Sequence, residues 1–443
     1  MTYALPILPG VVSGALLALS LAGGLFTGLE NFFEDRLFSE RALRSDIAIV
    51  AIDERALAEI GQWPWPRARL AEIVVALDRA GVAAIGLDVL LAEPSRFGPE
   101  DDARLSAALG RGTTRVVLPV EAAPLFIADG RATADTLIET REEFRAAPRA
   151  ARGHVNLIRD RDGVARRVPL FVAGPEGDAL PAFAAATVGV EASREESRAA
   201  ERIVFAGPPG TVPTYSVAAV CCADTAAGAS LAGRYVFIGV TAASLHDEAV
   251  TPTSRGRAMS GVEVQAQIAN MLLAGYRLRP LSAAYEIVWI FALSLAASAL
   301  FVQTRRLSVA ALGAFTLVAA NTVAVILLFE HGTVVNLVHT TLAPVLGGIG
   351  AFALRHFVLE REKRVIRNAF SKYVAADVLE ELLRDTSKLA LGGEEREVTV
   401  LFSDVRGFTA LSEGLSPQAL TQFLNRYLTA MTDIILAHRG VVD

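Results

Sequence analysis

Cysteine is nearly absent from this sequence, and neither sign of charge is in large excess. The only cysteines among 443 residues are Cys221 and Cys222, which are adjacent. A bond between neighbouring cysteines would be strained, so we exclude a disulfide framework and interpret the pair as small core residues. The formal net charge is −6 and no nucleic-acid-binding motif occurs. We therefore expect no DNA or RNA partner.

Apolar residues are plentiful instead. They make up 52% of the sequence, and the mean hydropathy of +0.41 is too high for an ordinary soluble protein. Long apolar runs occur at 4–29, 284–302, 307–329 and 334–358, and each can cross a bilayer. The sequence thus predicts four transmembrane helices in contact with membrane lipid. The first run lacks a basic start, so we interpret it as an uncleaved anchor that ends at Glu30.

Basic residues beside these runs predict how the chain crosses the membrane. Arg305 and Arg306 lie between the second and third runs. Five more lie at the end of the fourth run and beyond it, at Arg355, Arg361, Lys363, Arg364 and Arg367. The positive-inside rule places both groups on the cytoplasmic side of the inner cell membrane. Both chain ends are then cytoplasmic, and residues 31–280 are extracytoplasmic.

A transporter is a rival interpretation of such a chain. Away from their ends, the four runs contain Asn321, Asn336 and His339 as their notable polar residues, without Asp, Glu, Lys or Arg. Ion and proton pathways normally use such charged groups. Transport is therefore disfavoured.

Residues 31–280 alternate between strand and helix patterns, which is typical of an α/β domain. The predicted strands are 47–52, 82–87 and 235–240, and the predicted helices are 70–77 and 261–276. The first two strands and the helix between them, which Gly81 ends, predict a βαβ unit with a parallel pair. Residues 160–163 are expected to form a turn and 207–210 a loop.

Two acidic residues follow predicted parallel strands of this domain. Asp53 follows the strand at 47–52, and Asp88 follows the strand at 82–87. Such positions can line a ligand pocket at the carboxyl ends of strands. They can also cap helices or form turns, and that alternative is favoured.

Other polar and aromatic groups in the domain carry weaker signals. His246, Asp247 and Glu248 are consecutive, so they point in different directions and lack the spacing of metal ligands. Trp63 and Trp65 are flanked by prolines. They could stack on a ligand, but a rigid packed corner is the favoured interpretation.

One stretch near the C-terminal end joins a strand pattern to phosphate chemistry. Residues 398–403 alternate as a strand does, and Asp404 follows with a glycine-containing turn. A carboxylate at a strand end can hold a hard cation, while backbone N–H groups behind it face phosphate oxygens. The alternative is that Asp404 only caps the turn. A helix should then run from Ser416 and Pro417 towards Gly440.

The region between the last apolar run and this stretch is predicted to be a juxtamembrane signalling helix and linker over 359–390. A continuous helical pattern covers 354–383. It contains too few heptads to establish a coiled coil, and a simple amphipathic helix is the alternative.

The C-terminal stretch resembles the start of the class III nucleotide cyclase catalytic domain. The likeness is carried by Phe402-Ser403-Asp404-Val405-Arg406-Gly407-Phe408-Thr409 and by Leu391-Gly392-Gly393-Glu394 before it. It implies a cytoplasmic α+β domain of ferredoxin-like fold, begun by 391–443, and a homodimer that builds its sites across the subunit interface. That family's second metal-binding Asp and base-selecting residues would lie beyond Asp443. We therefore expect an incomplete domain, inactive in the 443-residue chain.

The same resemblance assigns roles to individual residues. Asp404 is implied as the catalytic group that bridges two Mg²⁺ or Mn²⁺ ions, and the Val405 carbonyl as a ligand of one ion. The backbone of the turn is implied to bind the substrate's phosphates, at Gly407, Phe408 and Thr409.

Residues 31–280 resemble the type-two CHASE family of extracytoplasmic sensory domains. The likeness is carried by segments 49–53, 63–66, 84–88, 162–169, 205–210 and 237–241. It implies that an extracytoplasmic ligand, of unknown identity, is sensed.

Together these patterns predict a membrane-bound sensor adenylate cyclase that converts ATP to cyclic AMP and pyrophosphate. A guanylate cyclase acting on GTP is the close alternative. A non-catalytic receptor that uses the cyclase-like end for dimerisation is another. A sensor kinase or diguanylate cyclase is disfavoured, because neither a phosphoacceptor-His helix nor a Gly-Gly-acidic-acidic-Phe motif occurs.

Overall fold

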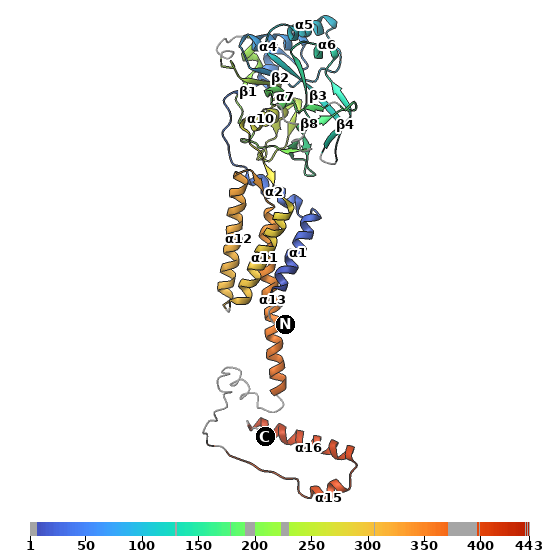
Figure 1. Ribbon diagram of the computed structural model, residues 1–443, viewed down its shortest axis with the longest axis vertical. Coiled ribbons are helices and arrows are strands. Elements are labelled where there is room, and N and C mark those ends of the chain that lie inside the picture. Colours follow the sequence, from blue (N-terminus) through green and yellow to red (C-terminus); the bar gives the residue numbers. More distant parts are fainter. Residues whose placement is uncertain are drawn as a thin grey trace.

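The computed structural model of the protein describes residues 7–128, 131–177, 179–190, 200–222, 230–304, 306–370, 397, 399–438, 440 and 442. Figure 1 shows an α/β domain at one end of the described chain, joined to a bundle of long helices. The last helix of that bundle, α13, extends well beyond the others.

The α/β domain is built on a nine-stranded sheet of order β11-β1-β12-β2-β3-β4-β8-β9, with β5 also paired to β3. Its strands are β1 (Ile47–Ile52), β2 (Ala84–Leu87), β3 (Arg115–Ala128), β4 (Arg131–Glu139), β5 (Ala150–His154), β8 (Phe171–Ala173), β9 (Ala179–Pro181), β11 (Thr214–Ser216) and β12 (Tyr235–Val240). The predicted strands at 47–52 and 235–240 are confirmed with the same bounds, and the third is confirmed from Ala84.

The predicted parallel pair of β1 and β2 is wrong in one respect. Both strands are parallel, but β12 lies between them: Ile49 is opposite Phe237, and Phe237 is opposite Gly86. β12 comes from nearly 150 residues farther along the chain, and its central side chains are buried against both neighbours. Local periodicity does not encode such a distant partner.

Helices cover both faces of the sheet, so alternate residues of a central strand enter two different cores. Ile47, Ile49 and Ala51 belong to one hydrophobic cluster. Ala48, Val50 and Ile52 belong to the other. The helices are α3 (Glu54–Ile60), α4 (Arg67–Arg79), α5 (Pro99–Gly110), α6 (Glu142–Arg145), α7 (Phe183–Val188), α8 (Val217–Cys222), α10 (Gly261–Ala274) and the 3-10 turn η1 (Ala243–Leu245). The predicted helices at 70–77 and 261–276 are confirmed as α4 and α10.

Short strands complete the domain and its junction with the bundle. They are β6 (Ile158–Arg159), β7 (Ala165–Val168), β10 (Glu201–Arg202), β13 (Glu248–Ala249), β14 (Met259–Ser260), β15 (Arg279–Pro280) and β16 (Thr333–Val334). The turn predicted at 160–163 and the loop at 207–210 are both present.

The two tryptophans between α3 and α4 form the packed corner that was favoured from the sequence. Their ring centroids lie 5.4 Å apart at 73°. Trp65 is buried, and its Nε1 donates a hydrogen bond to the Gly61 carbonyl over 2.7 Å. The pair therefore packs against the core next to α4.

Three helices of the bundle are long and apolar enough to cross a membrane: α11 (Ala283–Gln303), α12 (Leu307–Glu330) and α13, over its part Leu337–Phe357. The complete α13 is one helix of 34 residues, Leu337–Phe370. It thus enters the predicted juxtamembrane region without a break. Residues 371–390 of that region lie outside the described chain.

The anchor predicted over 4–29 is not one continuous helix. The chain forms α1 (Leu8–Ala22) and α2 (Thr27–Leu37), which meet at 85°, and the pair counts as a span only if taken together. Gly23 and Gly24 lie at the break, and Gly24 has a φ of +66°. Flexible glycines let the backbone turn there despite the apolar sequence, which hydropathy alone cannot reveal.

Although short, α1 packs closely against both α11 and α13 in the bundle. A Cβ on Gly10 would lie 2.9 Å from the Ser298 Oγ, so only glycine permits this approach. The Ser13 and Ser294 hydroxyls are 2.6 Å apart. Small residues and hydroxyl contacts of this kind are typical of helix packing in membranes.

The C-terminal segment contains two helices, α15 (Phe408–Glu413) and α16 (Pro417–Ala437). The predicted N-cap is confirmed, since the Ser416 Oγ accepts a hydrogen bond from the Ala419 N–H over 3.3 Å. The predicted strand at 398–403 is wrong for residues 399–403, which are irregular, and Val398 lies outside the described chain. A strand is stable only beside a partner, and none of the described residues pairs with this stretch. The expected α+β sheet is thus not formed by the described part of 391–443.

Candidate functional site

The turn that follows Phe402 exposes the carboxylate of Asp404. Its Oδ1 accepts a hydrogen bond from the Val405 N–H over 2.8 Å, and the Val405 carbonyl accepts one from the Phe408 N–H over 3.1 Å. Gly407 has a φ of +75°, which favours glycine, and it immediately precedes α15. The turn therefore leaves an acidic oxygen ligand and an exposed backbone next to a helix start.

The five predicted site residues lie on this one turn because they are nearly consecutive. They are Asp404, Val405, Gly407, Phe408 and Thr409. Asp404 does not cap α15, whose N-cap is Gly407 without a side-chain hydrogen bond. The carboxylate fits a hard cation by its chemistry. It stands alone, because the described residues hold no group of three or more His, Cys, Asp or Glu arranged for a metal ion.

The two strand-end acids of the α/β domain have different surroundings. Asp53 caps α3: its Oδ1 accepts hydrogen bonds from the Ala56 N–H and from the Ser216 hydroxyl, both over 2.8 Å. The favoured capping interpretation is confirmed for this residue. Asp88 instead lines a cavity of about 310 Å³. Burial, followed by the nearby charge of Asp247, raises the pKa of Asp88 to about 7.

A second cavity, of about 470 Å³, lies on the other side of Glu248. Glu263 of α10 contributes to its wall and accepts a hydrogen bond from the Gly210 N–H over 2.8 Å. Burial raises the pKa of Glu263, although backbone N–H groups of 210–212 act in the opposite direction. This carboxylate thus fixes the loop at 207–210.

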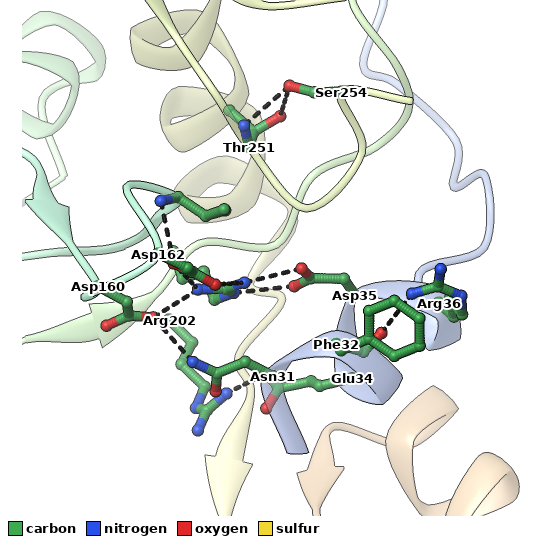
Figure 2. Close-up of polar contacts among 12 residues, drawn as sticks. Asn31, Phe32, Glu34, Asp35, Arg36, Asp160, Asp162, Arg202, Thr251 and Ser254 are labelled. Atoms are coloured by element: carbon green, nitrogen blue, oxygen red, sulfur yellow. Dashed lines mark hydrogen bonds and ion pairs between the residues drawn. The ribbon is translucent and has the colours of Figure 1, made fainter. Parts of the chain in front are cut away.

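A buried ion-pair cluster joins α2 to the α/β domain, and the sequence analysis missed it. The Arg166 guanidinium binds Asp35 of α2 over 2.8 Å, Asp160 over 2.9 Å and Asp162 over 2.7 Å. Figure 2 shows Asp35 pointing from α2 towards the turn that carries the other two acids. Glu34 of α2 also pairs with Arg202. The sequence shows that these residues are charged, but it does not predict that Asp35 pairs with Arg166, 131 residues farther along the chain.

The same helix α2 also binds the start of α13. The Glu30 carboxylate accepts hydrogen bonds from the backbone N–H groups of Val338 and His339, both over 3.0 Å. It lies 2.7 Å from the His339 Nδ1, and the other ring nitrogen lies 3.2 Å from the Ser20 Oγ of α1. An acid at a helix start is favoured by the helix dipole. Glu30, interpreted from the sequence only as the end of an anchor, is thus a buried structural contact.

Two family models match the chain. One, described as a CHASE2 domain, matches residues 11–299. The other, described as an adenylate and guanylate cyclase catalytic domain, matches residues 393–442. Both resemblances drawn from the sequence are therefore confirmed.

Curated relatives match over short stretches. An uncharacterized protein of Mycobacterium tuberculosis is 36% identical over 83 residues, which is 19% of this chain and 14% of the relative. An adenylate cyclase of Anabaena cylindrica is 31% identical over 85 residues, 19% of this chain and 16% of the relative. Adenylate cyclase 1 of Rhizobium meliloti is 27% identical over 73 residues, 16% of this chain and 11% of the relative. The chain thus spans a small part of each relative. No solved structure matches.

Proposed function

Because this chain belongs to the CHASE2 domain family, we propose that it is the sensory and membrane part of a nucleotide cyclase that converts ATP to cyclic AMP and pyrophosphate. The second family match, at 393–442, supports the reaction class. Two of the relatives that match this chain carry the name adenylate cyclase.

The observation that carries the proposal is the route from α2 to α13. Asp35 binds the α/β domain through Arg166, and Glu30 on the same helix binds the first turn of α13. α13 then runs unbroken from Leu337 to Phe370, towards the cyclase region. A ligand that changes the α/β domain would shift α2 and, with it, α13, provided that it binds one arrangement better than the other.

The chemistry is assigned to the turn at 404–409. Mg²⁺ or Mn²⁺, when bound, would lower the pKa of the ribose 3′-hydroxyl and offset negative charge on the triphosphate. Asp404 and the Val405 carbonyl would hold the ions. The backbone from Gly407 to Thr409 would bind the phosphates.

The remaining parts of the proposal concern orientation and assembly. The α/β domain lies outside the cell membrane and both termini lie in the cytoplasm, as supported by the basic residues at 305–306 and 355–367. The active form is a homodimer, so that α13 of each copy can change the relation between the two cyclase regions. The orientation is tested in intact cells with an impermeant thiol reagent and a cysteine introduced at Phe126, in a chain whose Cys221 and Cys222 are replaced by serine. An unlabelled Phe126→Cys variant would contradict the orientation.

The decisive experiment measures cyclic AMP formation in membranes that contain the natural protein. We expect Asp404→Ala to lower turnover by about a thousandfold or more, since each tenfold loss corresponds to about 1.4 kcal/mol of transition-state stabilisation. Asp433→Ala is the matched control, because Asp433 is also exposed but lies on α16. Equal activity of Asp404→Ala and Asp433→Ala would reject the proposal.

The same membranes test the two alternatives. Faster turnover of GTP than of ATP, abolished by Asp404→Ala, would identify a guanylate cyclase. A non-catalytic receptor would turn over neither nucleotide, and its signalling would be unaffected by that substitution.

A further inference from the structure

The cavity that Asp88 lines, which we call the acidic cavity, lies at the carboxyl end of β2. Its volume is about 310 Å³. Charged and amide side chains contribute to its wall from β3, β6, β13, α10 and the segments next to β2, β5 and β13. They are Asp88, Glu121, Asn156, Arg159, Asp247, Glu248 and Gln265. The volume is at the lower end of the range of small-molecule sites. With about 30 Å³ for each water, it holds roughly ten water-sized groups.

The inner part of the cavity presents hydrogen-bond acceptors without donors. Gln265 is 3% exposed; its Nε2 donates to the Val155 carbonyl over 3.2 Å, while its Oε1 is buried and has no partner. The half-buried Asp88 carboxylate beside it accepts no hydrogen bond from, and forms no ion pair with, any described residue. Buried acceptors are nearly always satisfied in native proteins. The buried Gln265 Oε1, left without a partner next to the Asp88 carboxylate, indicates that a donor binds there.

The outer part of the cavity is exposed and mainly acidic. It contains Glu121, Asp247 and Glu248, together with Arg159. No ion pair within 4.0 Å joins any of these groups to another described residue. When all are ionised, four carboxylates face one guanidinium in the cavity, which leaves three negative charges unbalanced. Such a cavity attracts a cation.

The walls are held in place by contacts independent of any ligand. The Asn156 Nδ2 donates to the Ala122 carbonyl over 2.8 Å, and its Oδ1 accepts from the Ala122 N–H over 2.9 Å. The Asp247 carboxylate lies against the start of α10, where a Cβ at Gly261 would be 2.7 Å from its Oδ1, and the Gly261 N–H donates to the Asp247 carbonyl over 3.0 Å. These contacts thus hold the wall at Asn156 and at the start of α10 in place without a ligand.

We infer that the acidic cavity is the sensory site and binds the protonated primary amine of a small ligand. This inference rests on the proposed sensory function and identifies the chemical class of the ligand that is sensed. An ammonium group carries three donors, which suit Asp88 and the Gln265 Oε1. A divalent metal ion is a poorer fit, because no three acidic or His residues of the described chain are arranged to hold one. The unbalanced outer charge favours a second ammonium group, as in a linear diamine, over the carboxylate of an amino acid.

Protonation of Asp88 should compete with the amine. With its pKa raised to about 7, mainly by burial, much of Asp88 is protonated at neutral pH in the free protein. The other charged groups facing it are Glu121, Arg159, Asp247 and Glu248, and desolvation within the cavity raises the pKa of Asp247 as well. A cation stabilises the ionised carboxylates, so amine affinity should rise as pH increases from 6 to 8.

The test uses the detergent-solubilised 443-residue chain at pH 8, with calorimetry and thermal unfolding. The probes are 1,5-diaminopentane, L-lysine and the uncharged 1,5-pentanediol. We expect the diamine to bind and to raise the unfolding temperature, and the diol to do neither. Asp88→Asn should weaken diamine binding at least tenfold, whereas Asp135→Asn, an exposed acid of β4 outside the cavity, should leave it unchanged.

Further variants distinguish a diamine from an amino acid as the ligand. Arg159→Gln should tighten diamine binding by removing a like charge; if the ligand class is an amino acid, the same variant should weaken lysine binding. Gln265→Leu provides a second loss variant should Asp88→Asn fail to fold. Binding of neither amine at millimolar concentration, equal binding of the diol, or full affinity in both loss variants would overturn the inference. Because no cyclase activity is measured, these outcomes leave the Asp404→Ala test unaffected.

Discussion

Two stretches of this protein are rich in strand-forming apolar residues and have opposite structures. All six residues of β1 (Ile47–Ile52) are buried, with β11 and β12 parallel on either side. Residues 399–403 form no strand, and there Leu401 is 78% exposed and Phe402 is 93% exposed. Propensity is similar in the two stretches, so the difference comes from partners that other parts of the chain provide.

Long-range contacts therefore provide most of the stability of this chain. In the α/β domain, side chains from distant segments bury one another's apolar surface and form ion pairs with one another. The described C-terminal segment relies on local features, such as the Ser416 cap of α16 and the turn at 404–407. Substitutions in the first region should therefore cost far more than matched substitutions in the second.

The largest effect is expected for Arg166→Gln. This buried guanidinium binds Asp35, Asp160 and Asp162, and their hydrogen bonds raise its pKa although burial alone would lower it. Removing one partner of a buried ion pair typically costs about 3 to 5 kcal/mol, since the remaining carboxylates lose their counter-charge. Urea unfolding of the solubilised chain, followed by fluorescence of Trp63 and Trp65, measures the loss.

The matched control is Arg55→Gln. Arg55 pairs with Glu59 on the surface of α3 over 2.8 Å, and both side chains are exposed. We expect a change in the free energy of unfolding below about 0.5 kcal/mol. Similar losses for the two arginines would show that the cluster at α2 is not a stabilising junction.

Ile49→Ala and Leu401→Ala test the comparison of the two stretches directly. Ile49 is fully buried between two parallel strands, so its truncation should cost about 2 to 4 kcal/mol through lost burial and a cavity. Leu401 is exposed, and its truncation should change the unfolding free energy by less than about 0.5 kcal/mol. The same unfolding curves measure both. A large loss for Leu401→Ala would mean that residues 399–403 have a packed partner after all.

A smaller effect than those of Arg166→Gln and Ile49→Ala, and a stabilising one, is expected for Asp88→Asn at high pH. The folded-state pKa of about 7 exceeds the ordinary 3.8, so the folded state holds this proton more tightly. Its contribution to stability is complete below pH 3.8 and is lost as pH rises towards 7. Asparagine carries no such loss, so the variant should be more stable by roughly 1 to 3 kcal/mol at pH 8, after allowance for solvent screening.

Unfolding midpoints at pH 5 and pH 8 provide the measurement for this prediction. The advantage of Asp88→Asn should be largest at pH 8 and clearly smaller at pH 5, where only part of the loss that begins at pH 3.8 has occurred. Asp135→Asn should show no such dependence, because Asp135 is exposed. An advantage independent of pH would mean that the Asp88 carboxylate is solvated as in an unfolded chain.

Sequence reasoning succeeded where one local signal determines the outcome. Periodicity identified β1, α4 and α10, and the Ser416-Pro417 pair identified the start of α16. It failed where the outcome depends on two distant segments. The insertion of β12 between β1 and β2 and the contact of Glu30 with His339 are both of this kind.

The candidate sites divide in the same way. The turn at 404–409 was identified because its residues are consecutive. Asp88 was named as a strand-end acid, but its difference from Asp53 depends on Asp247 and Gln265, which the fold brings from farther along the chain. Gln265 carries no sequence signal at all, since its importance comes from an acceptor left without a partner.

The 85° elbow before α2 gives this helix the geometry of a lever with its pivot at Thr27. At about 1.5 Å per residue, Asp35 lies roughly 12 Å from the pivot and Glu30 roughly 4.5 Å. A displacement of about 3 Å at Asp35 would therefore reach Glu30 as about 1 Å. The Glu30 carboxylate lies 2.7 Å from the His339 Nδ1, and a hydrogen bond lengthened by about 1 Å is broken. Helix α2 would thus convert a large movement of the α/β domain into a movement of Glu30 small enough to break one hydrogen bond to α13 and leave the rest of the bundle in place.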